Sequence, residues 1–391
     1  MRVLIAHNFY QHPGGEDVIF QAEGDLLERR GHEVIRFVKH NDDLADWSKV
    51  ALAGRTVWNA ATYRELSALI ASARPDVAHF HNTLPVISPS AYHAAAKAGV
   101  AVVQTLHNYR AICPSATLFR GGKVCEDCVG KRLAWPGVAH ACYRRSRGAT
   151  GAIAAMLAVH HVIGTWRDKI DRYIALTDFA RQRLVAGGYP AERIVVKPNF
   201  LSALPEHRRT DDGERAGALF VGRLRPEKGL DTMLAAWRDV ATPLTVIGDG
   251  PELERIRGQA PPNVKLAGAK TPEEVAEAMR RAAFLLVPSE WYEGYPLVVL
   301  EAFAAGLPVI ASRLGAMATM VEDGVTGLHF AASDAAGLAR KVSWALDHPR
   351  DLRQMGDNAR RKYESDYSPD GNYRRLIAIY EQAIAQRKAA A

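Results

Sequence analysis

The sequence predicts an α/β protein made of two doubly wound domains, and two observations support this prediction. Short apolar runs alternate with stretches of helical period along nearly all of the 391 residues. Alternation of this kind favours parallel sheets joined by right-handed crossovers. The series then starts again near residue 218, after a segment over 202–214 that contains proline and charged residues but few large apolar side chains. The second start indicates a domain boundary in that segment.

The first series is expected to hold five strands, because each apolar run is bounded by Gly, Pro, Asn or Asp. Two segments between these runs have the period of a helix. Residues 1–203 are therefore expected to form an N-terminal domain, with a Cys-rich insert over about 110–150. We expect its strands at 3–6, 34–38, 77–80, 100–106 and 173–176, and its helices at 22–30 and 63–73.

The second series repeats the alternation over residues 204–368, which are expected to form a C-terminal domain. The tail at 369–391 has helical period, ends in cations that suit a helix C-terminus, and is expected to complete the N-terminal domain. Ligands of open α/β sheets bind outside the carboxyl ends of the strands, so we expect the two domains to face each other across a cleft. Strands are expected at 218–221, 244–247, 264–267, 284–287 and 309–311, and helices at 230–240, 272–281, 296–305 and 316–322.

Charge and composition limit the classes of function. Hydrophobic residues make up 48% and charged residues 24%, which excludes a mainly disordered chain and a polytopic membrane protein. The formal net charge is +7, but the segment 110–150 alone carries eight basic and two acidic residues, a net of +6. A local excess of this kind predicts an anionic partner at one place: a membrane surface, a phosphorylated lipid or a nucleic acid. The first residues do not fit a signal peptide, so a cytoplasmic location is expected.

The densest functional motif follows the expected strand at 284–287. Glu293 lies in the loop before a helix that is expected to begin at Pro296, and Glu301 lies more than one turn inside that helix. The first backbone N–H groups, from Leu297 and Val298, would form an anion site. The two carboxylates could accept hydrogen bonds from sugar hydroxyls. Glutamates on a solvated helix face are the alternative interpretation.

A second motif follows the expected strand at 218–221. Arg223 and Lys228 lie in the loop at the carboxyl end of this strand. The guanidinium offers a planar fork and the ammonium a point charge, and together they can reach one phosphate group. Taken alone, a solvated turn is the simpler interpretation. Because the loop belongs to the same sheet as the two glutamates, we expect the two motifs to converge.

Together with Gly248-Asp249-Gly250-Pro251, these motifs resemble the retaining glycosyltransferases of family 4, which have the GT-B fold. The resemblance covers nearly the whole chain and rests on the order and spacing of the motifs. In the N-terminal half it includes Pro13-Gly14-Gly15, Thr105-Leu106-His107-Asn108, Ile174-Ala175-Leu176-Thr177 and Val196-Lys197-Pro198-Asn199.

The resemblance implies roles for individual residues. His107, Glu293, Arg223 and Lys228 would be catalytic, with the two cations on the donor diphosphate and His107 near the anomeric carbon. Gly14 and Gly15 would let the backbone approach the donor phosphate or the acceptor closely. Many members carry Gly where this chain has Pro296, which removes one N–H. The full donor-binding set implied is Gly14, Gly15, Arg223, Lys228, Glu293, Tyr295, Leu297, Val298 and Glu301.

The implied activity is transfer of a sugar, with retained configuration, from a UDP- or GDP-linked donor to a glycan or polyprenyl-diphosphate-linked acceptor in polysaccharide or glycolipid synthesis. No Asp-x-Asp metal motif lies in a suitable loop, so no catalytic metal is expected, and front-face attack is favoured because no carboxylate is well placed as a nucleophile. A nucleotide-sugar epimerase of the same fold is an alternative. A zinc-containing nucleic-acid-binding protein is a second one, disfavoured by the irregular spacing of aromatics near the insert.

The insert holds all four cysteines of the chain, Cys113, Cys125, Cys128 and Cys142. They are too few for a disulfide scaffold of this size. Their spacing, Cys-x11-Cys-x2-Cys-x13-Cys, is typical of a structural tetrathiolate zinc site. An iron–sulfur cluster and four thiols without a metal remain alternatives.

A basic run with Arg144, Arg145 and Arg147 comes directly before 19 residues, 148–166, that contain no Lys, Arg, Asp or Glu. That length is near the lower limit for crossing a bilayer, and its Gly, Ala and His content favours a buried or interfacial helix. Such a helix beside basic residues would suit peripheral docking to anionic headgroups or to a lipid diphosphate, at the inner face of the cell membrane. A solvated loop over a core helix is the alternative.

Overall fold

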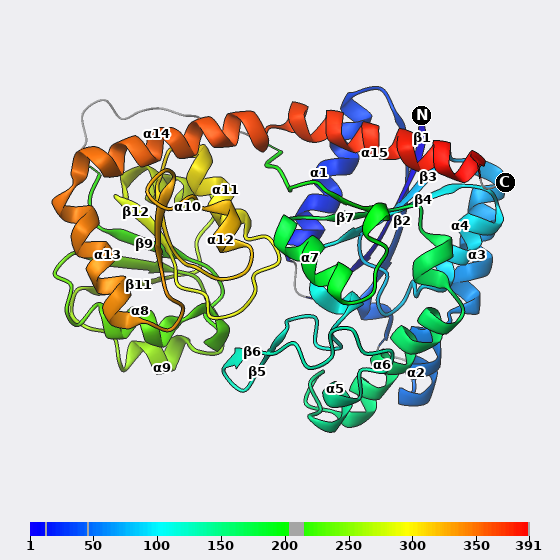
Figure 1. Ribbon diagram of the computed structural model, residues 1–391, viewed down its shortest axis with the longest axis horizontal. Helices are drawn as coiled ribbons and strands as arrows, with labels where there is room; N and C mark the ends of the chain where they lie inside the picture. The colour runs from blue at the N-terminus through cyan, green and yellow to red at the C-terminus, as the bar shows by residue number, and fades with distance from the viewer. Residues whose placement is uncertain (12–13, 45–46, 203–214, 390–391) are drawn as a thin grey trace. The chain divides into compact units, whose positions relative to one another are not determined.

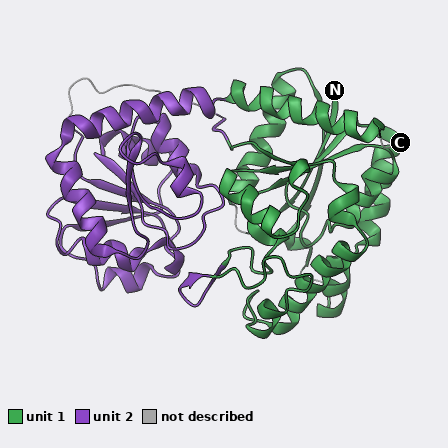
Figure 2. Cartoon of the chain, in the orientation of Figure 1, with its two compact units in different colours: residues 1–118, 125–199, 369–391 green, residues 119–124, 200–368 purple. Residues whose placement is uncertain are grey.

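The computed structural model describes residues 1–11, 14–44, 47–202 and 215–389. The chain divides into two compact units (Figure 2), which we describe separately. Unit 1 comprises residues 1–118, 125–199 and 369–391, and unit 2 comprises residues 119–124 and 200–368. Each unit contains a six-stranded sheet with helices around it (Figure 1).

The sheet of unit 1 is entirely parallel and has the strand order β2-β1-β3-β4-β7-β8. In this order the chain reverses its direction of winding between β1 and β3, which is where doubly wound sheets bind ligands. The strands are β1 (Arg2–Phe9), β2 (Glu33–His40), β3 (Val77–Phe80), β4 (Ala101–Leu106), β7 (Arg172–Ala175) and β8 (Ile194–Val196). The helices are α1 (Gly15–Arg29), α2 (Lys49–Val57), α3 (Ala60–Ala73), α4 (Ser90–Lys97), α5 (Trp135–Ala139), α6 (Arg147–Val162), α7 (Asp178–Ala186) and α15 (Pro369–Ala389).

The last helix, α15, is part of the core of unit 1. Its residues Leu376, Tyr380 and Ala383 pack in one buried cluster with Val3 and Ile5 of β1. The helix is drawn in red along the N-terminal sheet in Figure 1. Burying a side chain as large as that of Leu376 stabilises the fold by about 1.5–3 kcal/mol. The apolar face of the tail therefore explains why it forms a helix of 21 residues.

Unit 2 has a second parallel sheet, with the order β11-β10-β9-β12-β13-β14. Counted within the unit this is 3-2-1-4-5-6, the order of dinucleotide-binding folds, with its reversal between β9 and β12. The strands are β9 (Ala218–Val221), β10 (Leu244–Ile247), β11 (Val264–Gly268), β12 (Phe284–Val287), β13 (Val309–Ser312) and β14 (Gly327–Phe330). The helices are α8 (Leu230–Ala236), α9 (Leu253–Arg257), α10 (Pro272–Arg281), α11 (Leu297–Ala304), α12 (Met317–Met320), α13 (Ala335–Asp347) and α14 (Pro349–Asp366).

The predicted fold class of two doubly wound α/β units is confirmed, and several predicted boundaries need correction. Helix α1 begins seven residues before the expected 22, because Gly14 caps it and Asp17 accepts a hydrogen bond from the Gly14 N–H at 2.6 Å. The helices expected at 230–240 and 316–322 are shorter than predicted, ending at Ala236 and Met320. Strands β8 and β14 and helices α2, α4, α5, α7, α9, α13 and α14 were not predicted.

Three further predictions concern segments outside the regular sheets. Pro296 lies at the N-cap of α11 rather than in its first turn, with extended backbone angles. The Cys-rich insert forms a two-stranded antiparallel hairpin, β5 (Phe119–Arg120) with β6 (Lys123–Val124), followed by α5 and α6. Apart from Ser202, the boundary expected over 202–214 lies outside the described residues.

Glycine brings two loops of unit 2 into direct contact at the reversal point. Gly229, after the loop that follows β9, has φ +69° and packs on the backbone of Pro288, the first residue after β12. A Cβ atom at position 229 would lie 1.9 Å from the Pro288 carbonyl oxygen. Because no side chain fits in that space, only glycine lets the two loops approach this closely.

Replacing Gly229 with alanine should therefore destabilise unit 2 by more than the backbone strain of about 1–2 kcal/mol that a left-handed residue carries. Gly324→Ala is the matched control, because Gly324 has φ +76° and no atom within 4 Å of an added Cβ. Thermal unfolding of both variants measures the difference. Equal losses of Tm would contradict the steric argument.

Candidate active site

The candidate site in unit 2 lies at the carboxyl ends of two neighbouring strands. The chain leaving β9 carries Arg223 and Lys228, and the chain leaving β12 carries Glu293. Strands β9 and β12 pair in parallel, so both loops emerge at the same edge of the sheet. This edge coincides with the reversal of strand order, and the side chains gathered there can reach a common ligand.

Lys228 and Glu293 form an ion pair. The Lys228 Nζ donates a hydrogen bond to Glu293 Oε1 at 2.7 Å, and the Ser289 hydroxyl donates to the same oxygen at 2.6 Å. Only 5% of Glu293 is exposed. Burial by itself raises the pKa of Glu293, but the Lys228 charge and the hydrogen bonds outweigh burial, so the net pKa is lowered. The carboxylate therefore stays ionised and fixes the ammonium.

Further hydrogen bonds hold the two loops in register. The Glu290 N–H donates to the Glu227 carbonyl at 2.9 Å, and the Thr232 hydroxyl donates to Glu290 Oε1 at 2.6 Å. The Lys228 Nζ also lies 5.6 Å from the centre of the Trp291 ring, which is a cation–π distance. The ammonium is thus oriented before any ligand binds, which is what electrostatic stabilisation of a developing negative charge requires.

The other donor-binding residues predicted in unit 2 lie around this pair. Helix α11 begins at Leu297, followed by Val298, and no side chain of the described residues caps it. Glu301 is half-buried on this helix, and burial raises its pKa. Tyr295 packs at the edge of the core beneath the helix, and Arg223 is exposed in the same loop as Lys228. The structure thus joins Lys228 directly to Glu293 and leaves the roles of the other residues as predictions.

The candidate residues of unit 1 lie after β1 and β4. Gly14 is the N-cap of α1 and Gly15 is its first residue, whereas Pro13 of the predicted motif lies outside the described residues. His107 follows β4 and is half-buried, with its Nε2 3.0 Å from the Nδ1 of His81. Burial, together with the neighbouring His7, His79 and Lys197, holds the pKa of His107 well below its usual value.

A hollow within unit 1 adjoins His107. Its lining mixes aromatic and apolar side chains with polar groups, among them Tyr10, Glu16, Asn82, His107 and Trp166. Burial raises the pKa of Glu16, whose carboxylate accepts a hydrogen bond from the Asn108 amide at 3.2 Å. Aromatic and apolar side chains with a few polar groups among them are typical of pockets that bind small molecules. The sequence analysis did not predict this hollow, because its lining comes from many separate segments.

The four cysteines lie in one region, but their sulfur atoms are not all close enough together to bind one metal ion. None of them, all within the described residues, is joined by a disulfide. Burial raises the pKa of the Cys128 thiol to about 11, and the other three thiols are near enough to raise it further. Within the described chain, the three His, Cys, Asp or Glu side chains whose ligand atoms all lie within 4.8 Å of one another are Glu23, His79 and His81. The structural zinc site therefore stays a prediction.

The basic run lies on the surface of unit 1. Arg144, Arg145 and Arg147 are exposed at the start of α6. The uncharged segment expected over 148–166 forms most of α6 and the turn after it. None of the helices in the described ranges has the length and hydropathy needed to span a membrane.

Comparisons with known proteins agree with the fold and the motifs. Residues 14–199 match the family model "Glycosyl transferase 4-like domain", and residues 207–362 match "Glycosyl transferases group 1". The D-inositol 3-phosphate glycosyltransferase of Acidothermus cellulolyticus is 32% identical over 270 residues, which is 63% of this chain and 58% of that protein. The matched segments span between 21% and 58% of the length of such curated relatives.

Solved structures show the same fold at low sequence identity. Sucrose-phosphate synthase from Thermosynechococcus elongatus superposes with a TM-score of 0.70 at 18% identity, covering 98% of this chain and 99% of that one. The Anabaena protein HepE, solved in complex with UDP, superposes with a TM-score of 0.65 at 16% identity over the full length of both chains. At this low identity the two superpositions show that the fold is shared.

The fold, the paired motifs of unit 2 and the two family matches together identify the protein as an enzyme that transfers a sugar. The chain belongs to the family 4 glycosyltransferases with the GT-B fold.

The Lys228–Glu293 pair predicts a pH-dependent stability. Because the folded pKa of Glu293 lies below its ordinary 4.5, the ionised carboxylate stabilises the fold above that pH, and this contribution disappears as the pH falls through the folded value. The stability difference between wild type and Glu293→Gln should thus be constant near neutral pH and shrink in acid. Urea unfolding at several pH values measures it, with the exposed Glu254→Gln as control. A difference that persists unchanged to about pH 3 would contradict the ion pair.

The cysteine spacing predicts one tightly bound zinc per chain, detectable by elemental analysis of purified protein. Cys125→Ser should lose the metal and lower the Tm, because a structural zinc contributes folding free energy. Lys123→Ala, in the neighbouring β6 strand, should keep it. Bound iron with visible absorbance would identify a cluster instead, and four titratable thiols without metal would refute a metal site.

Proposed function

We propose that the protein transfers a sugar from a nucleotide diphosphate sugar to a glycan or lipid-linked acceptor with retention of configuration. The observation that carries this proposal is the Lys228–Glu293 pair at the point where the strand order of unit 2 reverses. A diphosphate placed there would meet a fixed ammonium, the exposed Arg223 and the first turn of α11. Glu301, further along that helix, could accept hydrogen bonds from ribose hydroxyls.

The charges present suit glycosyl transfer. The bond between the anomeric carbon and the diphosphate oxygen breaks, and the leaving diphosphate keeps the electron pair. The acceptor oxygen bonds to the same face of that carbon and passes its proton to the leaving phosphate. Negative charge therefore grows where Lys228, Arg223 and the helix N-terminus would lie, and positive charge grows at the sugar. In this proposal the cations supply the stabilisation that a divalent metal supplies in other transferases.

The donor is proposed to be UDP- or GDP-linked. The structural similarity to HepE, whose solved complex contains UDP, supports a uridine donor without excluding guanosine. A panel of nucleotide sugars can be tested by thermal shift, because a ligand that binds the folded state raises its Tm. If none raises the Tm or supports transfer, the proposed donor class is wrong.

The decisive variant is Lys228→Gln, which can still hydrogen-bond to Glu293 but carries no charge. We expect kcat/KM to fall by about 10²–10³-fold, the loss seen when one preorganised donor to a developing oxyanion is removed. Lys270→Gln is the matched control, because Lys270 is an exposed lysine of unit 2 that pairs with Glu274. Wild-type turnover in Lys228→Gln would place the reaction elsewhere.

Two further measurements use the same assay. NMR of the product reports whether the anomeric configuration is retained, and an inverted product would refute that part of the proposal. Activity in EDTA should match that without it, whereas a strict Mg²⁺ requirement for the chemical step would contradict the role given to the cations. Conversion of the donor to its epimer in the absence of acceptor would favour the epimerase alternative.

The acceptor is proposed to be presented at an anionic membrane surface. Unit 1 also exposes apolar side chains before and along α6: Leu133 is 52% exposed, Trp135 60% and Val162, at the C-terminal end of α6, 81%. Cations beside exposed apolar and aromatic side chains fit the interface of an anionic bilayer. This arrangement supports a lipid-linked acceptor at the inner face of the cell membrane.

Reversing the charge of Arg144, Arg145 and Arg147 to glutamate should abolish binding to vesicles that contain anionic lipid. Each cation near such a surface contributes about 1 kcal/mol. The control reverses Arg238, Arg353 and Arg361, which are exposed in unit 2 and give the same change in net charge. Cosedimentation measures both, and equal binding by the two triple variants would remove the membrane proposal.

A further inference from the structure

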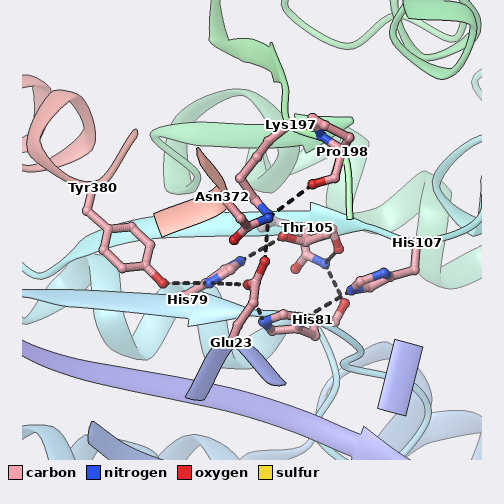
Figure 3. Close-up of polar contacts among 10 residues, drawn as sticks. Glu23, His79, His81, Thr105, His107, Lys197, Pro198, Asn372 and Tyr380 are labelled. Atoms are coloured by element: carbon pink, nitrogen blue, oxygen red, sulfur yellow. Dashed lines mark hydrogen bonds and ion pairs between the residues drawn. The ribbon is translucent and has the colours of Figure 1, made fainter. Parts of the chain in front are cut away.

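A buried polar network in unit 1 lies behind His107 and has no role in the site described so far. Glu23 comes from α1, His79 from β3 and His81 from the residue just after β3, and Lys197 follows β8 (Figure 3). These four side chains are between 0% and 1% exposed. Charged groups are rarely removed from water to this extent unless they are paired and hydrogen-bonded.

Lys197 and Glu23 form the charged end of the network. The Lys197 Nζ lies 2.5 Å from Glu23 Oε1. A buried ion pair of this kind contributes little net stability, because desolvation offsets most of the attraction. The ion pair also determines what the second oxygen of the Glu23 carboxylate needs. A carboxylate can only accept hydrogen bonds, so the second oxygen, Oε2, requires a donor.

His79 does not supply that donor. Its Nδ1 is 2.8 Å from the hydroxyl of Tyr380 on α15, and its Nε2 is 2.7 Å from the Thr105 hydroxyl. Both ring nitrogens are therefore engaged, and the nearer one is 3.9 Å from Glu23 Oε2. The same contacts argue against a metal among Glu23, His79 and His81, because the Lys197 ammonium already lies on the carboxylate.

His81 is placed to be the donor. Its Nε2 is 3.5 Å from Glu23 Oε2, and neither atom has a hydrogen-bond partner among the residues that the structure describes. On its other side the His81 Nδ1 is 3.0 Å from the Nε2 of His107, with the two rings stacked. Burial lowers the pKa of both histidines well below the usual value, so each ring is neutral and carries one N–H.

The position of each proton follows from these contacts. Because Glu23 only accepts, the N–H of His81 lies on Nε2. Its Nδ1 then carries a lone pair and must accept a hydrogen bond from His107. The N–H of His107 therefore lies on Nε2, and its Nδ1 keeps a lone pair. A hydrogen bond on one ring nitrogen fixes the tautomer in this way in many enzymes.

We propose that Glu23, held by Lys197, acts through His81 as a positioning residue that keeps His107 in the Nε2–H tautomer, so that His107 offers an acceptor nitrogen to the bound ligand. The functional part of this inference rests on the proposed sugar transfer, in which His107 lies near the anomeric carbon. The tautomer itself is a property of the protein without any ligand. The two parts can therefore be tested separately.

The first test measures tautomers by long-range ¹H–¹⁵N NMR of the ligand-free protein, with His107 signals assigned by their loss in His107→Gln. We expect Nε2–H on both His81 and His107 in the wild type. In Glu23→Gln the amide oxygen still accepts from Lys197, so the amide N–H₂ faces His81. His81 must then move its proton to Nδ1, and His107 must move its proton from Nε2 to Nδ1. Nδ1–H on either histidine of the wild type, or no reversal in the variant, overturns the proposal.

The second test is kinetic and uses the same variant. Reversal of the tautomer should lower kcat on the order of 10²-fold, with KM for the donor changed by less than about threefold, because the network does not touch the donor diphosphate. Glu28→Gln is the matched control, because Glu28 is an exposed glutamate on α1 that pairs with Arg36. It should keep both the tautomers and the rate of the wild type.

The outcomes separate this inference from the proposed function. Reversed tautomers with wild-type kcat overturn the positioning role while leaving sugar transfer in place. Absence of transfer by the wild type with every nucleotide sugar refutes the proposed function, and with it the positioning role, without changing the tautomer result. If Glu23→Gln fails to fold, the wild-type spectrum still decides the tautomer. His81→Phe, which keeps a ring but offers no acceptor, then decides the role: a similar loss of kcat supports it and an unchanged kcat overturns it.

Discussion

Each unit depends on one nearly inaccessible carboxylate that a lysine ammonium neutralises. Lys228 covers Glu293 in unit 2, and Lys197 covers Glu23 in unit 1. Removing a charge from water without a partner is unfavourable by several kcal/mol, so each pair forces two distant segments to stay together. In unit 2 these segments are the loops after β9 and β12, and in unit 1 they are α1 and the residue after β8. The same kind of contact thus holds two segments together beside each sheet.

The two sheets are not copies of each other. Unit 2 follows the order 3-2-1-4-5-6, whereas unit 1 follows 2-1-3-4-5-6, so the reversal falls between the first and fourth strands in one and the first and third in the other. The rule that ligands bind at the reversal holds for either order. It accounts for the positions of Lys228 and Glu293 in unit 2. It also accounts for the location of His81, directly after β3, beside α1 in unit 1.

Predictions from the sequence were best where a strand is buried on both faces. Strands β9 and β12 are uninterrupted apolar runs and β10 is interrupted only by Thr245, so their limits could be predicted. Strand β14 contains Gly327 and His329 and gave no such run. The start of α1 was missed because Gly15, Glu16 and Asp17 resemble a loop, and only the capping contact of Gly14 shows otherwise.

Lys228 and Glu293 could be found because each follows a strand. Their direct contact depends on how two loops pack, which spacing does not encode. Lys197 was noted only as part of the segment 196–199 and Glu23 was not noted, and their buried pairing was not predicted because charged side chains usually face solvent.

The position of α15 has a consequence for how the chain is made. This helix follows unit 2 in the sequence, yet its Leu376 and Tyr380 pack in the core of unit 1. The Tyr380 hydroxyl also forms a hydrogen bond with His79. During synthesis the ribosome must complete all of unit 2 before the helix emerges. The N-terminal sheet is translated first, but the part of its apolar face that α15 covers therefore stays uncovered until unit 2 has been translated.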